Sequence, residues 1–197
     1  MITEMTTWIE IMAVPSKYIQ SVVKAAKGRP KSSDRYRDKI KEFGTPKTLD
    51  LIRDGKQASS PFFGRLNMFI YDPKLKKKLP YYDTFPLVLP LEEYNDGFLG
   101  LNFHYLPIPL RMKLLDRVVD FSNNTKFDKS TTLGVSYNAL KRVRLIKPTI
   151  KRYLAGKVKS RFRRVDADEF TVATLLPVAR FKKGSQAKVY KDSRNML

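Results

Sequence analysis

The chain has 197 residues, no cysteine and a formal net charge of +20, from 39 lysine and arginine residues against 19 aspartate and glutamate residues. A chain of this length can bury a sufficient core unaided, and the lack of cysteine excludes a disulfide scaffold and thiolate zinc or iron–sulfur sites. The charge predicts a polyanionic partner, either nucleic acid, an anionic membrane surface or acidic protein neighbours, with simple solubility as the alternative.

No apolar run reaches the roughly 20 residues that a membrane-spanning helix requires. The first ten residues carry two glutamates and no basic residue, which is typical of neither a secretory signal nor a transit peptide. We therefore expect no membrane partner, and a protein made and used in the cytoplasm or in something assembled there.

Residues 1–60 are expected to form an N-terminal helical segment. Helical spacing of apolar residues predicts helices over 16–27, 34–43 and 46–54. A glycine follows the end of each helix, at Gly28, Gly44 and Gly55.

The most apolar and aromatic stretch runs from Gly64 to Tyr105, and turn signals at 72–74 and 95–97 divide it into strand-like runs. Alternation there predicts one face with Leu66, Met68, Ile70, Leu99, Leu101, Phe103 and Tyr105. The opposite face would carry Asn67, Phe69, Tyr71, Phe98, Gly100, Asn102 and His104. This pattern indicates an antiparallel meander with one face on the core and the other open to solvent or a partner.

Four lysines crowd the first turn of this stretch, at Lys74, Lys76, Lys77 and Lys78. Lysine clusters protect sheet edges from unwanted pairing, and they also make loops that grip a negative partner, so both roles stay open. Three prolines follow, at Pro80, Pro86 and Pro90. Because proline has no N–H for a ladder, this second part is expected to be bent, bulged or at an edge.

A helix is expected over 109–121, where leucines and valines form one apolar stripe. Residues 61–128 would thus form a central β-meander plus a packing helix. The strand and the helix should bury together Leu99, Leu101, Phe103, Leu114 and Val118.

Residues 129–197 form a basic C-terminal segment, and residues 129–165 contain twelve basic residues and no acid. Ser136 is expected to cap a helix that continues to Ile146, and a second short helix is expected from Pro148 to Gly156. Over 157–164 basic residues recur at every second position, which is the spacing of a strand. Such a strand would have one wholly cationic face, formed by Lys157, Lys159, Arg161 and Arg163.

The remaining residues give weaker patterns. Residues 166–176 combine a possible capping box, Asp166 with Glu169, and a strand-like run, so helix and strand both stay open. The polar, basic tail from Lys182 is expected to be loose in isolation. Together these patterns predict an α+β fold, with a central antiparallel β-meander packed by a helix, short helices before it, and basic helices and a strand after it.

The main contact with a polyanion or partner is expected on the cationic face of 157–164, supported by Arg142, Arg144 and Lys151. The lysines of the first turn are the next candidate, and the alternative is that all these side chains only solvate an exposed surface. Aromatic residues lie close in sequence to these lysines and arginines, at Tyr81, Tyr82, Phe85, Tyr153 and Phe162. They indicate either stacking platforms for single-stranded nucleic acid or ordinary core and interface residues.

The sequence fits no familiar catalytic pattern. A lone histidine, His104, cannot form a zinc site, and no nucleotide-binding, hydrolase or metalloprotease motif occurs. A metal-dependent nuclease would need carboxylates, for which the candidates are Asp83, Glu92, Glu93 and Asp96. The acid–x–lysine strand typical of such enzymes does not follow them. We expect no enzyme, no metal and no cofactor.

Three sequences stand out in the central stretch: YDPK at 71–74, LPYYDTFPLV at 79–88 and GFLGLNFHYLP at 97–107. Through them the chain resembles virion-associated proteins of large tailed, T4-like bacteriophages. The resemblance implies a structural or assembly component of the head, neck, tail or baseplate, located in the virion and assembled in the host cytoplasm. Its basic surfaces would dock other virion subunits with acidic surfaces. The alternative is a nucleic-acid-binding protein that contacts DNA.

Overall fold

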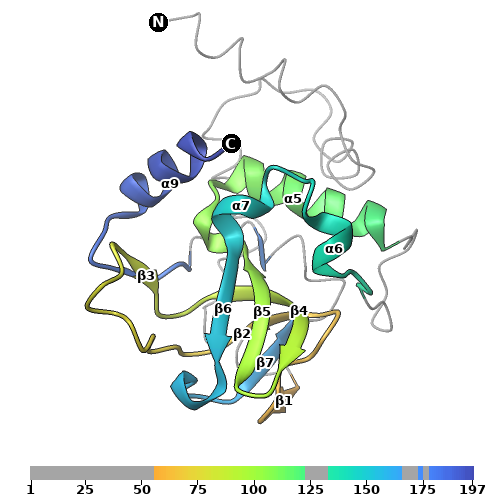
Figure 1. The fold of residues 1–197 in the computed structure, drawn as a ribbon, viewed down its shortest axis with the longest axis vertical. Coiled ribbons are helices and arrows are strands. Elements are labelled where there is room, and N and C mark those ends of the chain that lie inside the picture. Colours follow the sequence, from red (N-terminus) through yellow and green to blue (C-terminus); the bar gives the residue numbers. More distant parts are fainter. Residues whose placement is uncertain (1–55, 123–132, 166–172, 175–177) are drawn as a thin grey trace, which may run out of the picture. The chain divides into compact units, whose positions relative to one another are not determined.

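The computed structural model describes residues 56–122, 133–165, 173–174 and 178–197 (Figure 1). They form an α+β fold around a six-stranded sheet in the order β1-β7-β2-β4-β5-β6, in which each neighbouring pair is antiparallel. The strands of this sheet are β1 (Gln57–Ala58), β2 (Leu66–Met68), β4 (Leu87–Tyr94), β5 (Gly97–Asn102), β6 (Ile150–Leu154) and β7 (Phe162–Val165). A two-stranded sheet pairs β3 (Tyr82–Asp83) with β8 (Phe181–Lys182).

Helices precede and follow the later strands. They are α5 (Ile108–Phe121), α6 (Tyr137–Leu140), α7 (Ile146–Thr149) and α9 (Gln186–Asn195), with short 3-10 turns η1 (Phe103–Tyr105) and η2 (Ala155–Lys157). The helices predicted within 16–54 and the ambiguous residues 166–172 lie outside the described residues.

The predicted antiparallel meander is confirmed by β2, β4 and β5, which lie side by side in the sheet. The expected irregularity is found within β4, where the pairing with β5 shifts between Pro90 and Glu92. A bulge at this point lets an interior strand contain a residue that cannot donate a ladder hydrogen bond.

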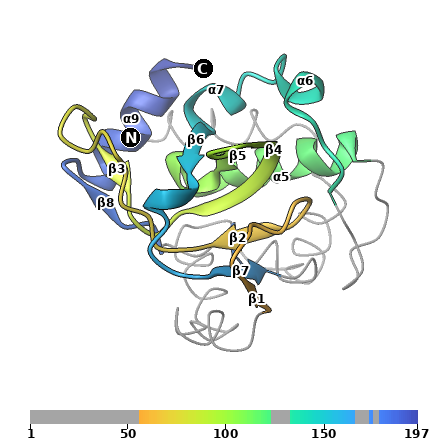
Figure 2. The same cartoon turned by 60° about the horizontal axis from the view of Figure 1, so that its bottom comes forward.

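The second face of the meander is not open, contrary to the expectation from alternation. It carries a buried cluster of aromatic and aliphatic side chains, which are Phe69, Tyr71, Val88, Phe98, Tyr153 and Phe162. A bridge between Tyr71, which follows β2, and Val158, directly after η2, brings the two sides of the sheet together. The sheet therefore curls around this cluster, as the curvature in Figure 2 shows, and both faces are covered.

The helix predicted over 109–121 is present as α5. Of the residues expected to be buried together, Leu101, Phe103, Leu114 and Val118 are fully buried. Leu99 is half-buried and is the exception.

The predicted helices and strand between 136 and 164 require correction. Ser136 does cap a helix, by accepting a hydrogen bond from the Ala139 amide, but α6 ends at Leu140. The helix expected from Pro148 to Gly156 is wrong, because residues from Ile150 onward form β6 and complete their hydrogen bonds with β5. The strand expected over 157–164 begins only at Phe162.

The C-terminal tail is helical rather than loose. Ser185 caps α9 by accepting a hydrogen bond from the Lys188 amide. One side of the helix is buried at Val189 and Ser193, and the Ser193 hydroxyl donates to the Tyr105 carbonyl at 2.7 Å. These contacts with η1 supply the stabilisation that the tail's own polar sequence lacks.

Replacing Ser193 with alanine should lower the free energy of unfolding by about 1 kcal/mol, because the buried Tyr105 carbonyl loses its donor. Urea denaturation followed by circular dichroism would measure the change. Asn195→Ala, at an exposed position of the same helix, is the matched control and should have little effect. Equal stability of the two variants would contradict the docking of α9 through Ser193.

Candidate nucleic-acid interface

Four exposed lysines lie in a tight turn between β2 and β3, which we call the lysine turn: Lys74, Lys76, Lys77 and Lys78. Backbone hydrogen bonds close the turn, from the Lys76 amide to the Pro73 carbonyl at 3.2 Å and from the Lys78 amide to the Leu75 carbonyl at 2.9 Å. Lys183, just after β8, donates its ammonium group to the carbonyls of Lys77 at 2.9 Å and Leu79 at 2.7 Å. The turn is therefore held in place with its own lysine side chains exposed.

The cationic segment 157–161 pairs with residues 70–72, which lead into the lysine turn. The Asp72 amide donates to the Lys157 carbonyl at 3.0 Å, and the Lys159 amide donates to the Ile70 carbonyl at 2.8 Å. Residues 157–161, here called the edge segment, thus continue the pairing at the Tyr71–Val158 bridge. Two basic clusters that are some 80 residues apart in sequence meet on one surface, which we call the basic surface.

Asp72 is the carboxylate at the junction of the two clusters. Its oxygens accept from the Lys76 ammonium at 2.8 and 2.9 Å. This hydrogen bond, followed by the charges of Lys76, Lys159 and Lys157, lowers the pKa of Asp72. The same contact raises the pKa of Lys76. Because both groups are exposed, the pair fixes a side chain more than it stabilises the fold.

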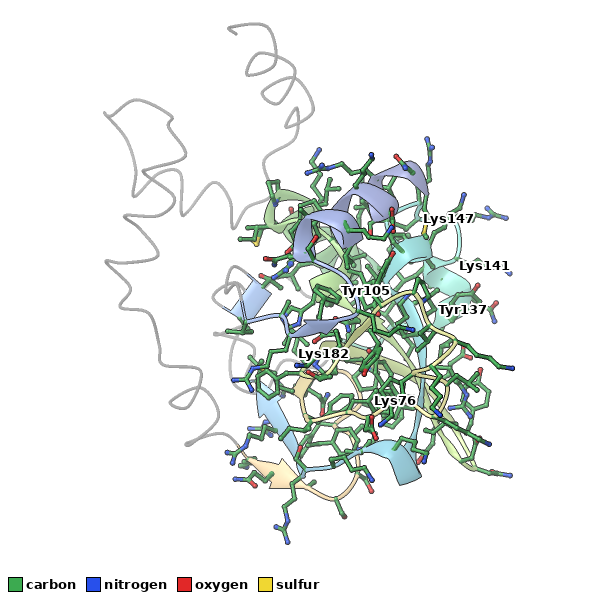
Figure 3. The ribbon with its side chains drawn as sticks, turned by 90° about the vertical axis from the view of Figure 1, so that its left-hand side faces the viewer. Lys76, Tyr105, Tyr137, Lys141, Lys147 and Lys182 are labelled. Atoms are coloured by element: carbon green, nitrogen blue, oxygen red, sulfur yellow. The ribbon has the colours of Figure 1, made fainter. Side chains whose placement is uncertain are left out.

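The other predicted contact residues do not lie on this surface. Arg142 and Arg144 follow α6 and precede β6, whereas Lys157 follows β6, so the five-residue strand separates them by roughly 17 Å. Figure 3 shows Lys141 and Lys147, from the same region as these arginines, apart from Lys76 and Lys182. The other two predicted contact residues away from this surface are Arg163 and Lys151.

Arg163 and Lys151 both lie within the six-stranded sheet. Arg163 is half-buried and pairs with residues of both β1 and β2. The Lys151 ammonium lies 4.2 Å from the centre of the Tyr105 ring, and burial lowers the pKa of this lysine to about 8. The aromatic residues predicted to stack on bases are also mostly internal, since Tyr153 and Phe162 belong to the buried cluster.

A buried carboxylate, Asp83, fixes the chain where it leaves the lysine turn. One oxygen accepts from the Phe85 amide at 3.0 Å and the Arg180 amide at 3.1 Å. The other lies 2.7 Å from Nδ1 of His104 and 3.4 Å from the side-chain nitrogen of Asn102. Asp83 therefore connects β3, β5, η1 and the residues before β8. No local pattern in the sequence identified this role.

The pair of Asp83 and His104 is an ionised carboxylate bound to a neutral imidazole. Burial lowers the pKa of His104 and outweighs the attraction of Asp83. Burial opposes ionisation of Asp83, but its contacts with His104 and the two backbone amides outweigh that cost and lower its pKa. Nδ1–H of the neutral ring then donates to the carboxylate.

The buried pair predicts a loss of stability in mild acid. The unfolded chain binds a proton at histidine below about pH 6.5, whereas the native His104 resists it, so the free energy of unfolding should fall as the pH drops below that value. Asp83 should add a further loss below about pH 4, because its native pKa is also lowered. Urea denaturation at pH 7.5, 6 and 5 would measure the loss of stability that His104 causes. In His104→Gln the free energy of unfolding should depend less on pH over this range. An unchanged pH dependence in that variant would show that another group causes the loss.

Metal and membrane features are absent from the described parts of the chain. Within them, no group of three histidine, aspartate or glutamate residues lies close enough to hold a metal ion. Among the described helices, none is both long and apolar enough to cross a membrane.

Comparison with known proteins identifies a family. The model of the family described as phage T4 terminal DNA protecting protein matches residues 10–195. No curated protein and no solved structure gives a significant match. The resemblance to T4-like phage proteins is thereby confirmed, and it extends from the central stretch to almost the whole chain.

Proposed function

Because the chain belongs to the phage T4 terminal DNA protecting protein family, we propose that it binds the ends of phage DNA through the basic surface. The observation that supports this proposal is the meeting of the lysine turn and the edge segment around Asp72. Cations grouped on one rigid surface neutralise several phosphates at once, and release of counterions then drives association with DNA.

The proposed role requires binding and no chemical step. A protein bound over a DNA terminus occupies the space that another protein would need to reach it. The basic surface is suited to this task because its lysines contact phosphates without reading the sequence. We therefore propose a non-enzymatic DNA-binding protein.

A second candidate is an assembly component in the virion, whose basic surface docks acidic subunits. The same exposed lysines support it, since carboxylates and phosphates both attract them. The family match favours the DNA-binding alternative over this first expectation.

The test is a binding titration with two duplexes of the same sequence, one with open ends and one closed by hairpin loops at both ends. Fluorescence anisotropy over a salt series gives the affinity and its slope. End binding predicts tighter binding to the open duplex and a log–log slope of several units. Equal, weak binding to both duplexes, together with co-purification with virion subunits, would instead support the assembly role.

Asp72→Asn should strengthen DNA binding. The change removes the carboxylate that opposes phosphate and occupies Lys76, so the affinity for open-ended duplex should rise severalfold at low salt. The same titration would measure it, with Asp192→Asn, which breaks a similar lysine pair on α9, as the control. An unchanged or weaker affinity for Asp72→Asn would place the DNA contact away from this carboxylate.

A further inference from the structure

A groove of about 630 Å³ lies at the end of the sheet where β4 turns into β5. We call it the hairpin groove. In Figure 1 this end of the sheet is at the bottom, where the β4–β5 turn, β1 and the chain after β6 approach one another. Its walls come from residues 59–61, 93–95, 97–98, 155 and 158–162. The volume falls within the range of about 300–1,000 Å³ that is usual for small-molecule sites.

Tyr94 is the exposed aromatic residue of the groove, with 44% of its surface accessible. The Arg152 guanidinium lies 4.1 Å from the centre of its ring. The Tyr94 hydroxyl donates to a Glu92 oxygen at 3.1 Å, and Arg152 is itself paired with Asp96. The ring is thus held in position at the tip of the hairpin by these contacts.

Two cations of the edge segment, Lys159 and Arg161, also line the groove. Both are exposed, and neither side chain makes an ion pair with another residue in the described part of the chain. Ser59 and Ser60 add exposed hydroxyl groups to the lining, and Glu93 is its one acid among the described residues. An aromatic ring fixed beside unpaired cations is the arrangement that holds a nucleotide by its base and its phosphate.

We propose that the hairpin groove receives the terminal nucleotide of a DNA strand, with its base stacked on Tyr94 and its phosphate bound by Lys159 and Arg161. This inference rests on the proposed function, and it explains how the protein would distinguish a DNA end from the interior of a duplex. Inside a duplex both faces of every base are covered by neighbouring bases. Only a terminal or unpaired nucleotide offers a free face to an aromatic ring.

The test compares variants of the full chain on the open-ended and hairpin-closed duplexes. Tyr94→Ala should weaken binding to the open duplex by about tenfold, as loss of one stacked base does, and should leave binding to the closed duplex unchanged. Tyr94→Phe keeps the ring and should retain the preference for ends. Lys77→Gln, in the lysine turn, should weaken binding to both duplexes by the same factor.

The outcomes separate the two proposals. If the wild-type protein prefers open ends and Tyr94→Ala keeps that preference, the groove is not the end site, while the proposed function stands. If the wild-type protein shows no preference for open ends, the proposed function fails and this inference fails with it. Circular dichroism of Tyr94→Ala would check that the variant is folded, as expected for an exposed side chain. Arg161→Gln should weaken binding to the open duplex more than to the closed one, because Arg161 belongs to both the hairpin groove and the basic surface.

Discussion

Replacing Asp83 with alanine should lower the free energy of unfolding by about 3–5 kcal/mol, because several buried donors would each lose their acceptor at a cost of about 1–3 kcal/mol. Both Asp83 and His104 are buried, and their side chains lie 2.7 Å apart. The substitution would leave the imidazole N–H and the amides of Phe85 and Arg180 without their acceptor. Each unsatisfied buried donor is costly by itself.

Urea denaturation at pH 7.5 would measure the loss, with Asp72→Asn as the matched control. Asp72 forms its ion pair with Lys76 on the surface, so its replacement should leave stability near that of the wild-type protein. Asp83→Asn should lose less stability than Asp83→Ala, because its amide oxygen can still accept from the Phe85 and Arg180 amides, and Nδ1 of a neutral imidazole can accept from the amide nitrogen. A loss of less than about 1 kcal/mol for Asp83→Ala would mean that Asp83 does not anchor the chain after the lysine turn.

Local patterns predicted those elements whose stability depends on nearby residues. The β4–β5 hairpin follows from the Asn95-Asp96-Gly97 turn, and α5 follows from its apolar stripe. Gly97 shows why the turn is specific, since its φ is +154° and a β-carbon there would lie 1.9 Å from the Tyr153 carbonyl oxygen. Both elements were therefore visible in the sequence.

Elements that depend on distant partners were not predicted. Ile150 to Leu154 form a strand because β5 supplies their hydrogen bonds, and no signal within residues 148–156 shows this. The same limit applies to the face with Phe69 and Phe98, where Tyr153 and Phe162 from later parts of the chain complete a buried cluster. Alternation showed the two faces but could not show that both are buried.

The candidate interface also combines features that nearby residues predict with features that depend on distant contacts. Charge alone identified the lysine turn and the cations after residue 156 as separate candidates. Backbone pairing of residues 70–72 with 157–159 unites them, and sequence gives no indication of that contact. The role of Asp83 was missed for a related reason, because an aspartate between two turns is ordinarily exposed.

Reversing two cations of the edge segment, by Lys159→Glu together with Arg161→Glu, should weaken DNA binding by at least about 100-fold in 0.1 M salt. Each phosphate contact contributes about 0.9 to the log–log slope, so loss of two contacts removes nearly two powers of ten at that salt concentration, and the new carboxylates add repulsion. The salt slope itself should fall by about two. The fold should persist, because Lys159 takes part in the sheet through its backbone and both side chains are exposed.

The matched control is Arg142→Glu together with Arg144→Glu, at the other end of β6. Each pair of substitutions changes the net charge by four, from +20 to +16, so the two variants differ in the position of the charges and not in their sum. A contact centred on the basic surface predicts that the control loses less than about fivefold, since salt screens charges beyond about 10 Å. Equal losses in both variants would show that DNA responds to total charge rather than to this surface. A larger loss in the control would move the contact to the turn between α6 and α7.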